Sequence, residues 1–195
     1  MLFLCITSFH YPIDILRLHT GKEYESVIRD STFPVLRNTA VYPSDPPRPG
    51  STWISNVTII EFDDPTYGFR LPPTIFGAVT YRDFKVATTT TSPMLNTLPF
   101  GESANLLELL QSMLESAGWK LEPKDKNDRF KIDTAADREQ LQAKLFEQAV
   151  SVNFYVPGKY SLLLVIKCYG RCDERDPRTA KYLIDVSVGS DYSSQ

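Results

Sequence analysis

The chain has 195 residues, of which 42% are hydrophobic and 23% are charged, and its formal net charge is −3. The high apolar fraction and small net charge exclude a disordered chain, and the lack of a basic excess argues against a protein that depends on phosphate contacts with nucleic acid. No apolar run approaches the roughly 18 residues that a membrane-spanning helix needs.

Prolines and threonines gather in the first hundred residues, which hold 11 of the 14 prolines and 14 of the 16 threonines. Proline removes a backbone donor and fixes φ, so short strands joined by loops are expected there. Residues 101–195 hold 13 of the 21 lysines and arginines, and this proline-poor part is expected to carry the helices. We therefore predict two regions: a β-rich, proline-rich region with extended arms over residues 1–99, and an α+β module over residues 100–195.

The chain begins with an apolar stretch, residues 1–9 (MLFLCITSF). No lysine or arginine precedes the apolar run and no small-residue cleavage pattern follows it, so a strand is expected rather than a signal peptide, and synthesis in the cytoplasm is expected with it. Residues 42–50 contain four prolines, which predicts an extended loop or arm.

Two later stretches of the first region predict strands. Residues 53–62 (WISNVTIIEF) are rich in β-branched side chains, which favour strands. Residues 74–91 alternate for much of their length and predict strands or a long β-ribbon. The four threonines at 88–91 oppose a helix.

The second region opens with a predicted amphipathic helix. Ser103 is the expected N-cap and Gly118 the residue that ends the helix, with apolar side chains at spacings of three and four between them. Gln111 is assigned to the polar outer face. Residues 119–122 and 129–132 alternate on either side of a polar turn and predict a hairpin.

A second helix is expected after Thr134, because Asp137 follows at the position of a capping box. Strands are then predicted at residues 152–156, 160–169 and 182–188. The order helix–strand–strand thus occurs twice, and a final strand follows. It predicts an antiparallel sheet with both helices packed on one face.

The three cysteines are expected to be reduced. Cys168 and Cys172 are four residues apart, about 13 Å on an extended strand, which is too far for a disulfide. Reduced cysteines suit a cytoplasmic origin. The spacing is not that of a zinc site either, and we expect no metal and no cofactor.

Groups that could support catalysis are few. The chain has two histidines, and it contains neither a serine-hydrolase elbow nor a phosphate-binding glycine loop. Glu61 and Asp63 are the best carboxylate pair, since alternate strand residues share a face and acid–base hydrolysis needs two converging carboxyls. The sequence Asp63-Asp64-Pro65 is more typical of a turn.

The predicted hairpin carries five basic residues among Trp119 and Phe130, a combination that suits single-stranded nucleic acid. Three acidic residues in the same stretch leave a local charge of about +2, too little to hold many phosphates. The hairpin is therefore interpreted as a solvated face, and nucleic acid is not expected as a partner.

Aromatic residues make up 12% of the chain, and tyrosine and tryptophan are favoured in the cores of interfaces. The same side chains would equally serve to cap the edges of the chain's own core. Edge strands within residues 53–62 or 160–169 would be able to extend a neighbour's sheet. The interface candidates are Tyr42, Trp53, Tyr67, Tyr81, Trp119, Tyr160 and Tyr192.

The helix that ends in residues 115–119 (ESAGW) before a predicted hairpin, together with the extended arms, resembles the virion proteins of tailed bacteriophages, the connector, neck, tail and baseplate components. The resemblance implies many copies in a ring, exchange of strands or arms between neighbours, location in the virion and no cofactor. We therefore predict a non-enzymatic structural or assembly protein that contacts other copies of itself and other structural proteins. A small hydrolase using Glu61 and Asp63, and a monomeric adaptor or inhibitor of a host protein, are the alternatives.

Overall fold

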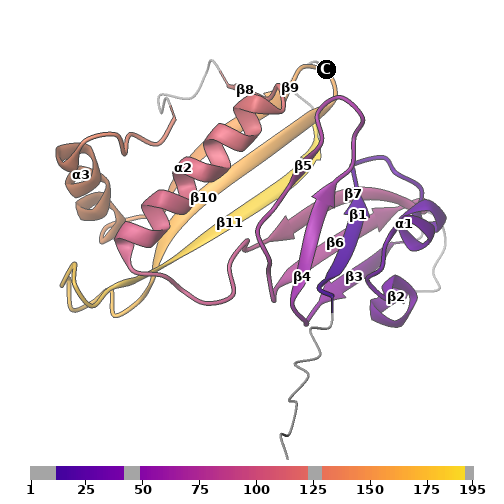
Figure 1. The fold of residues 1–195 in the computed structure, drawn as a ribbon, viewed down its shortest axis with the longest axis horizontal. Coiled ribbons are helices and arrows are strands. Elements are labelled where there is room, and N and C mark those ends of the chain that lie inside the picture. Colours follow the sequence, from indigo (N-terminus) through magenta and orange to yellow (C-terminus); the bar gives the residue numbers. More distant parts are fainter. Residues whose placement is uncertain (1–11, 42–48, 123–128, 192–195) are drawn as a thin grey trace, which may run out of the picture.

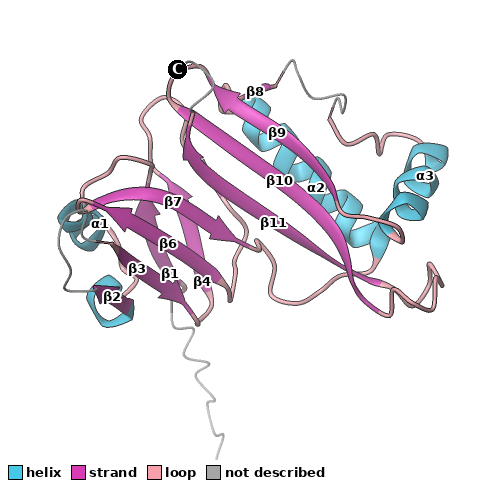
Figure 2. Ribbon diagram, turned by 180° about the vertical axis from the view of Figure 1, so that it is seen from behind, coloured by secondary structure: helices cyan, strands magenta, loops and turns pink. Residues whose placement is uncertain are grey.

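The computed structural model describes residues 12–41, 49–122 and 129–191. They form a mixed α+β fold that is 23% helical and 39% strand (Figures 1 and 2). This confirms the predicted fold class and its richness in strands. The expected strand at residues 2–9, most of the proline-rich arm, Tyr42 and Tyr192 lie outside the described residues.

The described elements follow one another in this order: β1 (Asp14–Leu18), α1 (Tyr24–Asp30), the 3-10 helix η1 (Val35–Asn38), β2 (Thr39–Val41), β3 (Gly50–Ile54), β4 (Thr58–Phe62), β5 (Phe69–Arg70), β6 (Gly77–Arg82), β7 (Lys85–Thr91), α2 (Phe100–Ser116), β8 (Lys120–Leu121), α3 (Ala135–Leu145), β9 (Val150–Val156), β10 (Tyr160–Gly170) and β11 (Lys181–Ser190).

Two sheets are formed. The larger has the strand order β2-β3-β6-β7-β11-β10-β9-β8, with every neighbouring pair antiparallel. The smaller has the order β1-β4-β5, and β1 runs parallel to β4. Residues 89–91 of β7 pair with residues 186–188 of β11, so strands from both predicted regions join in one sheet. The division of the chain into two domains near residue 99 stays a prediction.

The core of the second region lies between α2 and the sheet. Figure 1 shows α2 lying along β10 and β11. Alternate residues of β10 are buried because successive strand side chains point to opposite faces. The fully buried leucines of this layer are Leu107, Leu110 and Leu114 from α2 and Leu162 and Leu164 from β10.

The helix boundaries test the capping predictions. The capping box of α3 is confirmed, since the Thr134 side chain accepts a hydrogen bond from the backbone N–H of Asp137. Helix α2 ends before Gly118, whose φ of 82° suits glycine, but it begins at Phe100 rather than after Ser103. The Ser103 hydroxyl donates to the carbonyl of Pro99 at 3.0 Å and therefore belongs to the first turn. Among the described residues, no helix has the length and apolar character to cross a membrane.

The prediction of one strand over residues 53–62 is wrong. The chain leaves β3 after Ile54 and enters β4 at Thr58, and these two strands belong to different sheets. Both halves keep a period of two in burial, so alternation along the sequence could not reveal the change of sheet. The predicted ribbon over residues 74–91 is present as the antiparallel pair β6 and β7.

The predicted hairpin of the second region is also not formed. β8 pairs with β9, while Phe130 and Ile132 are buried against the rest of the core. Gln111, predicted to face outward, is fully buried, and its Oε1 accepts a hydrogen bond from the Phe130 backbone N–H at 2.6 Å. A buried amide must be paired, and this pairing joins residues 129–132 to α2 in place of a strand partner.

The two strands expected at sheet edges lie inside the sheet. β10 has β11 on one side and β9 on the other, and β3 lies between β2 and β6. The edges of the larger sheet are β2 and β8, three and two residues long. Such short edges give little backbone for a neighbouring strand to pair with.

Candidate functional site

The carboxylates predicted as a hydrolytic pair each have a partner of their own. Glu61 lies on β4 opposite Arg17 of β1, and its Oε1 is 3.4 Å from the Arg17 Nε. Asp63 follows the end of β4, where it contacts His19 at 2.8 Å and the buried ammonium of Lys22. The second carboxylate of Lys22 is Asp30, at 3.0 Å. This arrangement joins β1, α1 and β4 electrostatically, and a hydrolytic role stays a prediction.

Two opposing effects set the ionisation of Asp63. Burial alone would raise the pKa of this carboxyl, but the hydrogen bonds from His19 and Lys22 outweigh burial and hold the pKa below its usual value. Asp63 therefore stays charged in the folded protein at neutral pH. Its charge compensates that of Lys22, which would be costly to bury alone.

Asp64 stabilises the turn between β4 and β5. Its Oδ1 accepts the backbone N–H groups of Thr66 and Tyr67, both at 2.9 Å, and its Oδ2 accepts the Tyr160 hydroxyl at 2.8 Å. Burial acts to raise the pKa of Asp64, yet these bonds lower it overall. The turn expected from Asp-Asp-Pro is thus present, and Asp64 anchors it to β10.

The aromatic interface candidates occupy different environments. Trp119, Tyr160 and Tyr81 are buried within the chain, and burial raises the pKa of Tyr81 to about 12. Tyr67 is partly buried against the same core. Trp53, by contrast, is 54% exposed on β3. Of the candidates that the structure describes, Trp53 therefore offers the most surface to another molecule.

A groove of about 580 Å³ lies where the two regions of the large sheet meet. We call it the junction groove. Half of its lining side chains are apolar or aromatic, and several of these are more exposed than is usual for their type. It is lined by Ile75, Phe76, Thr90, Ser92, Met94, Leu95, Asn96, Thr97, Lys167, Tyr169, Leu183 and Asp185.

The chain between β7 and α2 shapes this groove. After β7, residues 92–98 run beside β11, and Leu98 and Tyr182 exchange two backbone hydrogen bonds of 3.1 and 2.8 Å. This pairing fixes the loop against the sheet. Leu95, at the middle of the loop, is consequently held in an exposed position, with 42% of its surface accessible.

Three polar side chains of the groove form an internally paired group. Asp185 of β11 accepts the Ser92 hydroxyl and the Lys167 ammonium, the latter at 2.7 Å. Because the positive and negative charges compensate each other, covering this group would leave no buried charge unpaired.

A second groove, of about 490 Å³, adjoins the first and shares Met94 and Leu95 with it. We call it the helix groove because α2 supplies one side. Leu109 of α2 is 56% exposed there. The helix groove is lined by Pro72, Pro73, Pro93, Met94, Leu95, Leu98, Glu102, Asn105, Leu106 and Leu109.

The sequence contains a signal for this second groove. Leu106, Leu109 and Met113 repeat at spacings of three and four and form their own stripe beside the buried stripe of α2. The face of the large sheet against which α2 packs covers only the buried stripe and leaves the second stripe partly uncovered. The apolar face of α2 is therefore wider than its own core requires.

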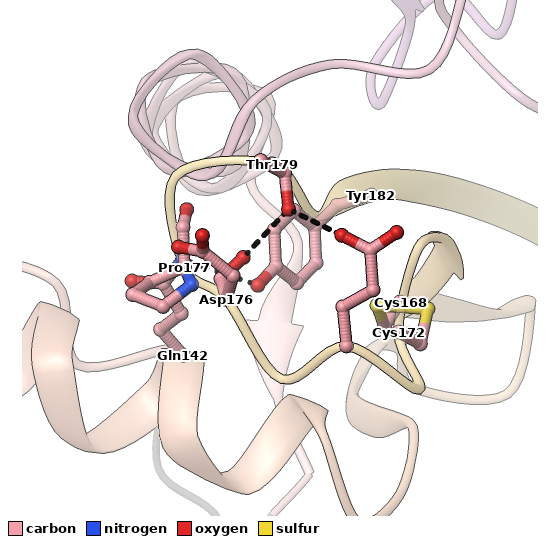
Figure 3. The surroundings of a disulfide bond; sticks show 8 residues. Gln142, Cys168, Cys172, Asp176, Pro177, Thr179 and Tyr182 are labelled. Atoms are coloured by element: carbon pink, nitrogen blue, oxygen red, sulfur yellow. Dashed lines mark hydrogen bonds between the residues drawn. A yellow bond between two sulfur atoms is a disulfide. The ribbon is translucent and has the colours of Figure 1, made fainter.

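The expectation that all three cysteines are reduced is wrong, because Cys168 and Cys172 form a disulfide (Figure 3). The 13 Å estimate assumed that the strand continues. Instead the register of β10 shifts between Cys168 and Gly170, and Arg171 adopts a φ of 58°. The two Cα atoms thus come within 5.9 Å, and the cysteines no longer indicate a reducing compartment.

The disulfide lies at the base of the loop that joins β10 to β11. Figure 3 shows this loop beside α3, where the Gln142 amide donates to the Pro177 carbonyl and contacts the Tyr182 hydroxyl, each at 3.1 Å. Tyr169 lies between the two cysteines in the sequence and is 66% exposed. The disulfide therefore restrains the end of β10 from which Tyr169 contributes to the junction groove.

Replacing both Cys168 and Cys172 by serine should lower the free energy of unfolding by about 2 kcal/mol, the chain-entropy value for so short a closed loop. Urea denaturation of the double variant and of oxidised wild type measures the difference. Reduction of the wild type by a dithiol should give the same loss. A change below about 0.5 kcal/mol in both experiments would contradict a stabilising disulfide.

Comparisons of the chain with family models, with curated proteins and with solved structures find no match. The grooves and the side chains around them therefore indicate what the chain does.

Proposed function

We propose that this chain is a structural or assembly protein that acts through protein–protein contacts, first of all with other copies of itself. The observation that carries the proposal is the collection of exposed apolar side chains on two adjoining grooves. Large exposed apolar patches on a protein surface mark sites of interaction. The exposed members are Ile75, Phe76, Leu95, Leu109 and Tyr169.

The charge pattern of the junction groove favours a protein partner over a charged small molecule. Among the described residues that line it, only Lys167 and Asp185 are ionised, and these are paired with each other. Interface cores are depleted in free charge and enriched in aromatic side chains and methionine. Phe76, Tyr169 and Met94 supply these residue types here.

The neck, tail or baseplate of a bacteriophage virion is the setting proposed for these contacts, on the resemblance of the helix end and arms to such proteins. In that setting one chain occupies several equivalent positions around an axis. A groove that receives a neighbouring copy then repeats at every interface.

The substitution Leu95→Asp tests the proposal, because Leu95 belongs to both grooves. The wild type should show a mass above 22.1 kDa that rises with concentration in size-exclusion chromatography with light scattering. The variant should need at least a tenfold higher concentration to associate, since a carboxylate would have to be buried unpaired.

Leu36→Asp is the control, because Leu36 is an exposed leucine of η1, more exposed than Leu95, that lines neither groove. Both variants should unfold in urea within about 0.5 kcal/mol of the wild type, as exposed substitutions do. A wild type that stays at 22.1 kDa at every concentration would contradict self-association, and equal effects of the two variants would contradict the role of the grooves.

A further inference from the structure

The disulfide encloses the most exposed aromatic side chain of the junction groove. Tyr169 lies between Cys168 and Cys172 in the sequence and is 66% exposed. It lines the groove together with Phe76. Aromatic side chains are frequent anchors of protein interfaces, so Tyr169 is the groove residue with the most surface to bury against a partner.

Tyr169 is also the extra residue of a β-bulge. Cys168 of β10 pairs with Tyr182 of β11. The next pair joins Gly170 to Lys181, so no residue of β11 lies opposite Tyr169. A bulge bends the strand and redirects the side chain at that point. The direction of Tyr169 therefore depends on the local backbone and not on the regular ladder.

The disulfide restrains this local backbone. Arg171 follows the bulge with a φ of 58°, in the left-handed region that is unfavourable for a residue other than glycine. The two cysteine Cα atoms are 5.9 Å apart, whereas strand residues four apart are separated by about 13 Å. The ion pair of Arg171 with Glu174 is exposed and too weak to replace a covalent bond. Opening the disulfide therefore removes the restraint on the direction of Tyr169.

The rest of the loop is held by contacts that do not involve the cysteines (Figure 3). The Thr179 hydroxyl donates to Glu174 at 3.1 Å, and the Gln142 amide of α3 donates to the Pro177 carbonyl. Opening the disulfide thus changes residues 168–172 and leaves the remainder of the loop in place.

A reductant can reach the disulfide, because both cysteines are partly exposed and Cys172 lies between the exposed Arg171 and Asp173. The thiolate of a dithiol attacks one sulfur, and its second thiol then resolves the mixed disulfide. The S–S bond of the protein breaks, two electrons and two protons pass to the cysteines, and the dithiol leaves as its own disulfide.

We propose that the Cys168–Cys172 disulfide is a redox switch of the junction groove: the oxidised chain presents Tyr169 to a partner, and reduction by a dithiol withdraws it. This inference rests on the proposed function, since it adds a control to the same contacts. Oxidation then favours self-association. By linkage, association in turn makes the disulfide harder to reduce.

Light scattering after size-exclusion chromatography, with and without a dithiol, tests the switch. The reference chain carries Cys5→Ser, so that oxidation cannot link two copies through the third cysteine. Reduction should raise the concentration needed for association by at least about fivefold, the effect of losing one interface contact of moderate strength. Circular dichroism should show that both states are folded. Equal association of the two states would overturn the proposal and leave the proposed function intact.

Tyr169→Ala in the reference chain separates a switch that acts through Tyr169 from a general loss of stability. The oxidised variant should associate as weakly as the reduced reference chain, and reduction should weaken it by less than about twofold, because effects on one contact are not additive. Trp53→Ala is the control, since Trp53 is an exposed aromatic residue that lines neither groove. Its association should keep the full response to reduction. A full response in Tyr169→Ala would overturn the proposal.

Trypsin cleavage after Arg171 gives a readout that does not depend on association. Reduction should speed this cleavage because the turn opens, while cleavage after Lys159, in the turn between β9 and β10, should keep its rate. An unchanged rate at Arg171 would overturn the switch. The absence of association in both redox states would refute the switch and the proposed function together.

Discussion

Lys22→Met should lower the free energy of unfolding by about 3 kcal/mol, the cost of breaking a buried ion pair by removing one partner. The Lys22 side chain is 7% exposed and lies between Asp63 and Asp30. Methionine keeps most of the apolar stem but removes the cation, so both carboxylates lose the charge that compensates them. Urea denaturation monitored by tryptophan fluorescence measures the change.

Lys85→Met is the control for this prediction. Lys85 also pairs with a carboxylate, that of Glu23, but both side chains are more than half exposed. Exposed pairs contribute about 0–1 kcal/mol, so a difference near 2 kcal/mol or more is expected between the two variants. Equal losses of unfolding free energy would show that the buried ion pair of Lys22 contributes no more to stability than the exposed pair of Lys85.

The free energy of unfolding at acidic pH gives a second measurement on the Lys22→Met variant. The pKa of Asp63 in the folded protein lies below its ordinary value, so its contribution to stability is present above the unfolded pKa and is lost as the pH falls through the folded pKa. Without Lys22, the folded pKa rises. The Lys22→Met variant should therefore start to lose this contribution at a higher pH than the wild type.

Trp119→Ala should lower the free energy of unfolding by about 3–5 kcal/mol, the range for truncating a buried aromatic side chain. The Trp119 ring packs against Phe62 and Phe69 from one region and Tyr160 from the other, and its Nε1 donates to the Tyr67 carbonyl at 2.9 Å. The substitution removes this packing and leaves that carbonyl without its partner. Chemical denaturation of the variant measures the loss.

Trp53→Ala is the matched substitution at an exposed tryptophan. Since 54% of Trp53 is accessible, the change in unfolding free energy should be well below that of Trp119→Ala. If Trp119→Ala cost no more than Trp53→Ala, the aromatic cluster would not be the connection between the two regions that its contacts indicate.

Local patterns predicted local structure well. The capping box at Thr134 depends on side chains three residues apart, and the end of α2 at Gly118 depends on one residue's conformational freedom. Alternation likewise located β9, β10 and β11 within two residues at either end. These features are determined by neighbours in the sequence, so a single sequence contains them.

Features that depend on distant partners were missed. Gln111 is polar and was assigned to solvent, although its spacing of four from Leu107 and three from Leu114 places it on the buried stripe. Only the position of Phe130 shows why an amide is tolerated there. The disulfide between Cys168 and Cys172 depends on a turn that the alternating strand pattern did not predict. The grooves form only because β7 pairs with β11.

That pairing also sets a condition on folding. Thr90 and Ser187, which face each other across β7 and β11, are hydrogen bonded although 97 residues separate them. Contacts between such distant residues form slowly, because a long loop must close before they contribute. During synthesis, residues 89–91 of β7 therefore stay unpaired until the ribosome has made β11, much later. Until β11 arrives, this edge is open to the wrong strand, including that of a neighbouring nascent chain.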